Sequence, residues 1–310
     1  MSCVRRFAFV PLFWVGLLWG GLAQALPEIQ HWRTDNGAQV YFVASPQLPM
    51  VDVRVVFNAG AARDDGNPGL AALTNDMLSQ GAGDLDADAI AERFDAVGAR
   101  FGTQARRDMA VVSLRSLTRS ELLNPALDTL ALILAKPRFS ATALERERGR
   151  MLVALERQAQ SPGDIAEKAL YKAVFRDQPY ATPMLGTRES VAKLTAQQVR
   201  GFHQRYYVAK NAVVAIVGAL DRAGAQRLAE RVVSGLAPGE AAPHLAPVPP
   251  LRTGKRIDID YPSAQTHVLV GQPGMQRGDP DYFPLYVGKA VPARAGPASP
   301  LTEDARARGA

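Results

Sequence analysis

The sequence predicts an α+β fold, in which an antiparallel or mixed sheet is flanked by helices. Two observations predict it. Short runs with an apolar residue at every second position alternate along the chain with longer runs whose apolar residues recur every three or four positions. Several short runs also occur in pairs joined by turn residues, such as Asp35, Asn36 and Gly37, and such pairs indicate hairpins.

The first 25 residues have the three-part pattern of a secretory signal peptide. Arg5 and Arg6 precede an apolar run over residues 7–21, and small residues around Ala25 predict cleavage after that position. The alternative is a retained anchor, which needs about 20 apolar residues, whereas this run is shorter and contains Pro11. We therefore expect an exported protein, periplasmic in a bacterium, with no membrane span after cleavage.

The composition excludes several classes of function. With 47% apolar and 21% charged residues, the 310-residue chain has an ordinary globular balance. Its single cysteine, Cys3, lies in the predicted leader, so we expect no disulfide, cysteine-ligated zinc or cysteine nucleophile in the mature chain. The formal charge of +6 falls to +4 without the leader's two arginines, and the remaining basic residues alternate with acids, which disfavours a nucleic-acid partner.

Residues 26–236 are predicted to form one complete domain. Alternating apolar residues indicate strands, and a change to helical periodicity follows Asn67 and Pro68. Ser161 and Pro162 separate two of the longer helical runs. The expected strands are residues 31–33, 38–44, 51–58, 101–107, 109–117 and 212–217. The expected helices are residues 69–80, 86–97, 120–135, 141–160, 163–175, 195–207 and 221–236.

The rest of the chain is predicted to be a linker and the start of a second unit. Residues 237–253 are rich in proline, which is typical of a linker. A strand expected at residues 256–260 opens an incomplete second domain over residues 254–310. From about residue 290 the sequence loses any periodicity that could bury a face.

Several segments in order along the chain resemble the M16 family of metallopeptidases, the pitrilysin and insulinase group that includes the mitochondrial processing peptidases. The matching segments are residues 57–64, 67–77, 186–189 and 194–218, and the resemblance covers residues 28–290. It implies the LuxS/metalloenzyme-like fold of that family, with one complete copy of the M16 domain and the beginning of a second. Members continue well beyond residue 310, so the resemblance also implies a chain shortened by truncation or by a reading-frame change near Lys289.

The resemblance places the family's metal site on positions without suitable ligands. Active members carry an inverted His-x-x-Glu-His signature and a third ligand, a glutamate, about 75 residues later. These positions fall on Ala72, Asn75, Asp76 and Ala154. A methyl group cannot bind zinc, an amide cannot act as general base, and one carboxylate cannot hold the metal alone. For Asp76 a solvated or capping carboxylate is the favoured interpretation over a residual metal role.

Nearby residues do not replace the lost ligands. On a helix Glu156 is turned about 200° away from Ala154. The four histidines, at positions 31, 203, 244 and 267, have no ligand spacing to one another. We therefore expect no metal in this chain and no cofactor, with zinc only in an active partner.

A second site implied by the resemblance is a sheet edge that binds peptide. In the family, substrate peptides add a strand to an exposed edge, where main-chain hydrogen bonds provide affinity. The matching positions are Arg100, Phe101, Gly102, Thr103, Gln104 and Ala105. The alternative is an ordinary strand that ends at a turn.

The combined pattern predicts a catalytically inactive M16-like subunit. It would bind unfolded peptide and support an active M16 peptidase partner. Two alternatives stay open, a stand-alone peptide-binding or scaffold protein and a nonfunctional truncated product. The sequence leaves open whether the chain is an enzyme, and the substituted metal and base positions favour no proteolysis by this chain alone.

Overall fold

The computed structural model describes residues 28–293, and side chains through residue 288. The predicted signal peptide, residues 1–25, and the end of the tail that was predicted to be aberrant, residues 294–310, lie outside the described residues. The described chain forms two compact units, and each is considered by itself. One contains the described residues up to Leu155 together with Pro183–Pro243, and the other contains Glu156–Thr182 together with the described residues from His244 onward.

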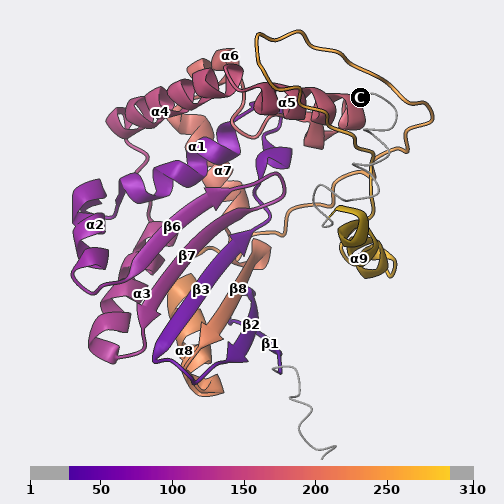
Figure 1. Ribbon diagram of the computed structural model, residues 1–310. Helices are drawn as coiled ribbons and strands as arrows, with labels where there is room; N and C mark the ends of the chain where they lie inside the picture. The colour runs from indigo at the N-terminus through magenta and orange to yellow at the C-terminus, as the bar shows by residue number, and fades with distance from the viewer. Residues whose placement is uncertain (1–27, 294–310) are drawn as a thin grey trace, which may run out of the picture. The chain divides into compact units, whose positions relative to one another are not determined.

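The first unit is built on a six-stranded mixed sheet (Figure 1). In spatial order the strands are β1 (Gln30–Arg33), β2 (Gln39–Ala44), β8 (Ala212–Gly218), β3 (Met50–Phe57), β7 (Ala110–Leu117) and β6 (Arg100–Ala105). β2 and β8 run parallel, which the long connection between them permits, and the other neighbouring strands are antiparallel. The α+β fold with a mixed sheet is confirmed.

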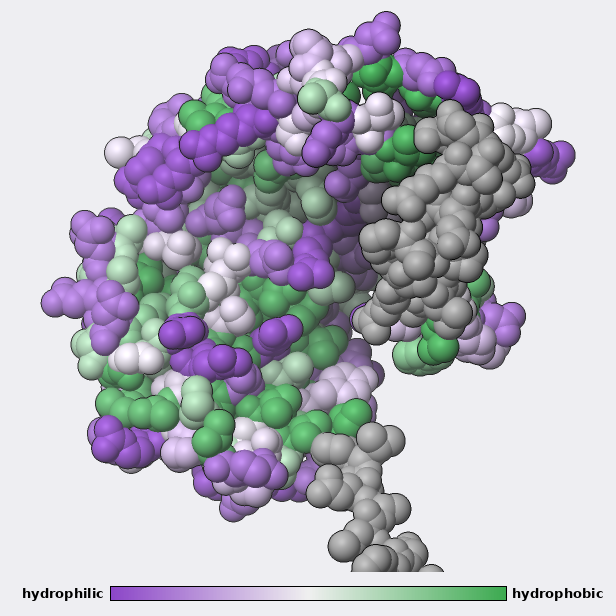
Figure 2. Space-filling view, in the orientation of Figure 1, coloured by the Kyte–Doolittle hydropathy of each residue, from purple (hydrophilic) through white to green (hydrophobic). Residues whose placement is uncertain are grey.

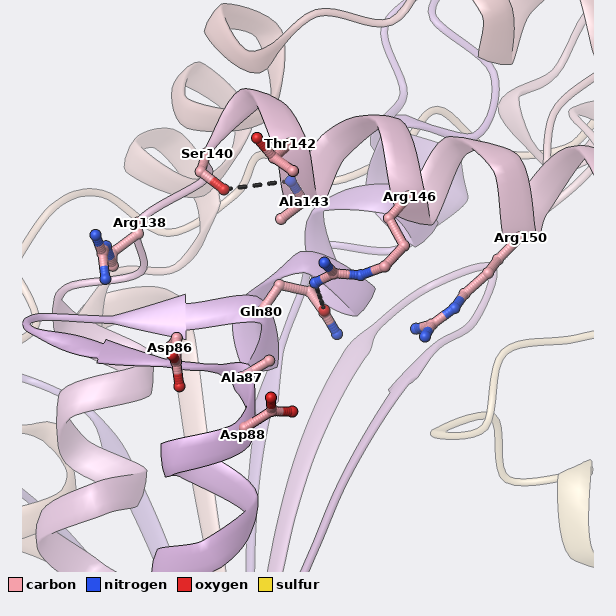
Figure 3. Close-up of a pocket in the computed structure, with 10 residues that line it drawn as sticks. All are labelled: Gln80, Asp86, Ala87, Asp88, Arg138, Ser140, Thr142, Ala143, Arg146 and Arg150. Carbon is pink, nitrogen blue, oxygen red and sulfur yellow. Dashed lines mark hydrogen bonds between the residues drawn. The ribbon is translucent and has the colours of Figure 1, made fainter.

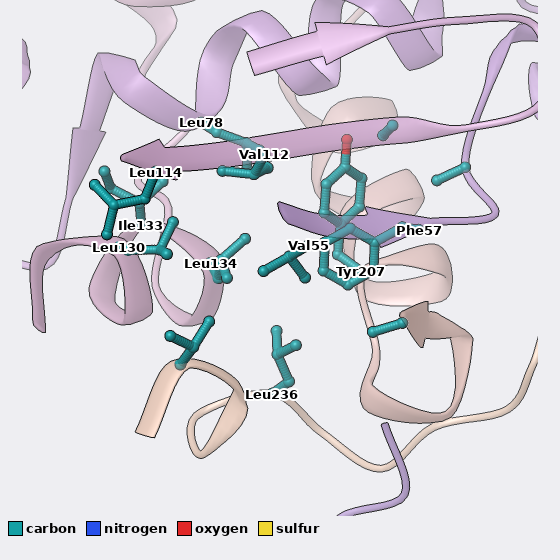
Figure 4. Packing of buried hydrophobic residues seen from close by; sticks show 14 of the residues in the cluster. Val55, Phe57, Leu78, Val112, Leu114, Leu130, Ile133, Leu134, Tyr207 and Leu236 are labelled. Carbon is teal, nitrogen blue, oxygen red and sulfur yellow. The ribbon is translucent and has the colours of Figure 1, made fainter. Parts of the chain in front are cut away.

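Alternation along the strands buries one face of this sheet. Val55 of β3, Val112 of β7 and Val214 of β8 are all 0% exposed. Against this face pack α3 (Ser120–Ala135), with Leu130 and Leu134 in the core (Figure 4), and α8 (Arg222–Val233), with Leu228 and Val232. Each fully buried aliphatic side chain contributes roughly 1.5–3 kcal/mol, so this face holds the unit together.

The opposite face of the sheet remains open. Tyr41 is 40% exposed and Val217 45% exposed, while Arg115 pairs with both carboxylate oxygens of Asp52 across β7 and β3 at 2.7 and 2.9 Å. Figure 2 shows hydrophobic and hydrophilic residues interleaved over this face. Because this face carries both polar and apolar residues, the strand sequences alternate between apolar and polar positions and are not continuous apolar runs.

The remaining elements agree with the predicted order, with four additions. The other helices of the first unit are α1 (Leu70–Met77), α2 (Ala87–Asp95), α4 (Ala141–Ala159), α6 (Arg188–Lys193) and α7 (Ala196–Tyr206); α4 ends in the second unit. The short 3-10 turns are Ala61–Arg63, Leu78–Gln80, Pro179–Ala181 and Ala209–Asn211. The sequence did not predict α6, the two-residue strands β4 (Gly81–Ala82) and β5 (Leu85–Asp86), or α9 (Tyr282–Ala293). The six-residue α6 and the two-residue strands are too short to show a periodicity.

The second unit contains α5 (Pro162–Phe175) and α9, and it corrects one prediction. Residues 244–281 contain no helix or strand, so the strand expected at residues 256–260 is wrong. A strand needs a neighbour to pair with, and within the described residues none lies beside this segment, leaving Ile257 and Ile259 45% and 48% exposed. Within residues 28–293, no helix has the length and apolar character to cross a bilayer.

Candidate functional site

The start of α1 is held by a buried carboxylate. Asp64, 2% exposed, accepts hydrogen bonds from the main-chain N–H groups of Gly69 and Ala71, both at 2.8 Å. It thereby caps the helix, since Gly69 with φ of 94° offers no side chain to do so. Burial raises the pKa of Asp64 to about 7, although the two N–H donors oppose this shift.

Two signature positions on α1 lie in the core. Ala72 is 4% exposed and Asn75 is 0% exposed. The Asn75 amide donates to the hydroxyl of Tyr207 at 3.3 Å, while its carbonyl oxygen has no hydrogen-bond partner among the described residues. Tyr207 packs against Phe57 and stacks on His203, with ring centroids 4.7 and 5.0 Å apart (Figure 4). Asn75 is therefore part of a packed interior and not of an open site.

His203 does not act as a ligand in this interior. Its Nε2 lies 3.0 Å from the carbonyl oxygen of Leu134, and burial lowers its pKa to about 4. The neutral ring donates that hydrogen bond and packs against Phe139. His203 is thus a core histidine with a satisfied nitrogen.

The third signature position, Asp76, faces charged residues of α4. Burial, and after it the nearby Glu147, raise the pKa of Asp76 to about 6, and Arg150 opposes both effects. Glu147 is 5% exposed and forms ion pairs with Arg150 at 2.8 Å and Arg146 at 3.7 Å. The carboxylates of Asp76 and Glu147 are therefore balanced by the guanidinium group of Arg150 and do not form a cluster of metal ligands.

The residues at the family's metal site do not fit zinc. Ala154 lies on α4 one turn after Arg150, and its methyl group offers no ligand. Within residues 28–293, no three His, Cys, Asp or Glu side chains come together in a way that could hold a metal ion. Asp76 remains as the single potential zinc ligand among the four signature positions, too few for a tetrahedral site.

β6 is an edge strand, paired with β7 on one side. The N–H group of Arg106 donates to the carbonyl of Met109 at 2.8 Å, so Arg106 and Met109 are a hydrogen-bonded pair of the β6–β7 ladder. Because bonded and non-bonded pairs alternate in an antiparallel ladder, Gly102 and Gln104 bond to β7. The main-chain groups of Phe101, Thr103 and Ala105 accordingly face away from β7.

A loop beside β6 fixes the end of this hairpin. The N–H groups of Ala61 and Ala62 donate to the carbonyls of Arg106 and Arg107, both at 2.9 Å. Gly60 permits the approach, since a Cβ there would lie 2.3 Å from the carbonyl oxygen of Arg107. The end of β6 is therefore held by main-chain hydrogen bonds to the segment that leads into α1.

Two adjoining hollows lie beside the start of β6. The first, of about 580 Å³, is lined by apolar residues that include Ile90, Phe94 and Phe101, and also by the charged residues Asp95 and Arg100. Phe94 and Phe101 stack with ring centroids 4.9 Å apart. The second, of about 600 Å³, lies between the first turn of α2 and α4 (Figure 3). Gln80 and Ala87 line both hollows, which therefore adjoin and are together called the groove.

The second hollow has walls of opposite charge. Figure 3 shows Arg146 and Arg150 reaching from α4 toward the segment that carries Gln80, with Asp86 and Asp88 below them at the start of α2. Sequence reasoning missed Glu147 and its arginines because the run around them looked like an exposed helix face. The available signal was the spacing. Arg146 and Arg150 are one helical turn apart, and Glu147 lies two turns before Ala154, so all of them lie near one face of the helix.

Comparison with known proteins identifies the family. Residues 39–188 match the model described as Insulinase (Peptidase family M16), and residues 193–301 match that described as Peptidase M16 inactive domain. A solved peptidase M16 inactive domain from Pseudomonas fluorescens is 36% identical, with a TM-score of 0.84 over 91% of this chain and 68% of that one. The chain belongs to the M16 peptidase family.

Three further matches are 21–28% identical to this chain. An uncharacterized zinc protease from Rickettsia bellii is 28% identical over 67% of this chain and 50% of its own length. Bovine cytochrome b-c1 complex subunit 1 is 26% identical over 86% of this chain and 56% of its own. Pitrilysin shares the fold with a TM-score of 0.63 over 73% of this chain and 25% of its own, at 21% identity. The chain thus spans about half the length of the curated M16 relatives it matches.

Proposed function

We propose that this M16 chain is a non-catalytic subunit that binds extended peptide along the edge of β6 and supports an active zinc-peptidase partner in the periplasm. One observation carries the proposal. The four positions of the family's zinc site hold Ala72, Asn75, Asp76 and Ala154, while the fold around them is kept. Loss of the ligands on two separate helices, α1 and α4, argues against chemistry by this chain and for retention of the scaffold.

Peptide binding draws its support from β6. Phe101, Thr103 and Ala105 present main-chain donors and acceptors away from β7, as a strand-adding peptide requires. The apolar hollow next to Phe101 offers a place for a peptide side chain. Support for the partner comes from relatives named as subunits, in the cytochrome b-c1 complex and in the mitochondrial-processing peptidase. The periplasmic location rests on the leader at residues 1–25.

Thr103→Pro tests the β6 edge. The substitution removes one outward N–H without breaking a bond to β7, and proline is tolerated in edge strands at such positions. Loss of one main-chain hydrogen bond costs about 1 kcal/mol, so we expect roughly fivefold weaker binding of a labelled unfolded peptide in fluorescence anisotropy. Thr103→Ala is the matched control and should bind like the wild type. Equal affinities of the two variants would refute binding along β6.

The partner role needs a separate measurement. The partner to test is a homologue from the same genome with an intact His-x-x-Glu-His signature. Chelator-sensitive peptide cleavage is measured in three samples: the homologue alone, this chain alone, and the two mixed. We expect activity in the mixture to exceed that of the homologue alone, and none from this chain. A mixture no more active than the homologue would favour a stand-alone peptide-binding protein. Zinc-dependent cleavage by this chain alone would overturn the proposal.

A further inference from the structure

We infer that the groove beside β6 selects acidic peptides, whose carboxylate side chains bind the arginines Arg138, Arg146 and Arg150. The inference rests on the proposed function, because it uses the same peptide-binding edge, and it adds the chemical class of the peptide. It follows from the continuity of the two hollows, from the pairing of the arginines and from the chemistry of guanidinium groups.

The groove leads from β6 directly to these arginines. The apolar hollow begins at Phe101, where the main chain of β6 faces outward, and Gln80 and Ala87 connect it to the second hollow. Arg146 donates to the Gln80 side chain at 2.6 Å, which places its guanidinium group at the junction of the two hollows. A peptide that lies along β6 and continues past Phe101 and Arg100 therefore reaches Arg146 at this junction.

The arginines have donors to spare. Arg146 and Arg150 share one carboxylate, that of Glu147, whose side chain is 6% exposed. Arg150 is 63% exposed and Arg146 45% exposed, so most of their N–H groups face the groove and solvent. The Arg138 side chain has neither a hydrogen-bond nor an ion-pair partner among residues 28–293.

The charge balance favours an incoming carboxylate on this wall. Arg146 and Arg150 share the single buried carboxylate of Glu147, and Arg138 adds a third guanidinium group to the lining of the hollow. The acids Asp86 and Asp88 stand on the opposite wall at the start of α2, where Asp86 accepts from the N–H of Ala89. A bound acidic side chain is thus drawn toward α4 and repelled from α2.

Guanidinium groups suit this task better than other cations. Their planar N–H groups match the two oxygens of a carboxylate, and such pairs are stronger than neutral hydrogen bonds. The neighbouring hollow is lined by Ile90 and Phe94 as well as by Asp95 and Arg100, and its apolar part suits an uncharged side chain. The groove therefore fits an extended segment that has an apolar side chain near an acidic one.

Three versions of one labelled peptide test the inference on the full chain. Each has a central phenylalanine, an amidated C-terminus, and flanking residues that are all Glu, all Gln or all Lys. In fluorescence anisotropy at low salt we expect the Glu peptide to bind about three- to tenfold more tightly than the Gln peptide, and the Lys peptide most weakly. High salt should reduce the difference, because the ion pairs are partly exposed.

Matched variants locate the effect. Arg138→Gln alone and together with Arg150→Gln should progressively reduce the preference for Glu over Gln, while Arg119→Gln, exposed at the start of α3, should leave it unchanged. Urea unfolding checks that each variant folds, and Arg138→Gln removes no partner of a buried group. A preference that survives in the double variant would place the acid elsewhere and overturn the inference.

The remaining outcomes separate this inference from the proposed function. Equal binding of the three peptides, still weakened by Thr103→Pro, overturns the acidic preference and leaves the β6 edge intact. No binding of any peptide overturns both. A Gln peptide with a free C-terminus that binds as tightly as the amidated Glu peptide would show that the groove recognises a terminal carboxylate, and the assignment to acidic side chains would then be wrong.

Discussion

Gly186 is expected to be essential for the anchoring of α1, and replacing it with alanine tests this. Its φ is +72°, and a Cβ there would lie 2.2 Å from the carbonyl oxygen of Pro68 and 2.7 Å from the Ser190 hydroxyl. That hydroxyl donates to the same Pro68 oxygen at 2.7 Å. Opposite, Gly69 at φ +94° would bring a Cβ to 2.8 Å from the Leu185 carbonyl oxygen. Two glycines thus allow two main-chain segments to touch where α1 begins.

Two terms set the magnitude for Gly186→Ala. An alanine in the left-handed region costs about 1–2 kcal/mol. The close contact with Pro68 involves main-chain atoms that cannot rotate away, and relief of such overpacking typically costs about 1–3 kcal/mol. The variant should therefore be destabilised by about 2–5 kcal/mol, a large fraction of a typical unfolding free energy.

Urea unfolding followed by circular dichroism measures the effect. Gly201→Ala is the control, because a Cβ at this position of α7 meets no atom within 4 Å, and it should stabilise the chain by about 0.5–1 kcal/mol. If Gly186→Ala unfolds at the wild-type urea midpoint, the packing argument for the start of α1 is refuted.

Two further predictions concern protons and metal. The folded state holds the proton of Asp64 with a pKa of about 7 against an ordinary 3.8, so more protons are bound in the folded than in the unfolded chain between these values. The unfolding free energy should therefore fall as the pH rises from about 4 to about 7, and this group contributes on the order of 4 kcal/mol to the fall. Asp64→Asn should flatten this dependence on pH. Urea unfolding at several pH values measures it, and an unfolding free energy of the wild type that does not change with pH would contradict the reasoning. A chelator should leave the urea midpoint unchanged, because Ala72, Asn75 and Ala154 offer zinc no ligand, and a lowered midpoint would reveal a metal site.

Much of the secondary structure could be predicted because its signals are local. Residues 51–58 were predicted as a strand and β3 spans Met50–Phe57, since its apolar side chains alternate over its whole length. The helices predicted at residues 120–135 and 141–160 match α3 and α4 in the same way. The strand predicted at residues 256–260 failed because its local pattern said nothing about whether a neighbouring strand existed.

The site was predictable only in part. The substituted signature positions could be read from the residue types alone, because a methyl group or an amide has the same ligand chemistry in any fold. The contact of Asn75 with Tyr207, 132 positions later, could not be predicted, and neither could the burial of Glu147 beside Asp76. These depend on how helices pack, which periodicity does not specify.

The sequence by itself determined that this chain alternates strands and helices and that zinc ligands are missing from both helices of the family's site. Both properties belong to residue types and their spacing. Only the tertiary structure decided that β6 lies at an edge, that Thr103 faces outward, and that Arg146 and Arg150 stand beside the groove. Strand order and helix packing bring together residues that are far apart in the chain. The free energy of those contacts depends on the whole core, and no short segment of the sequence specifies it.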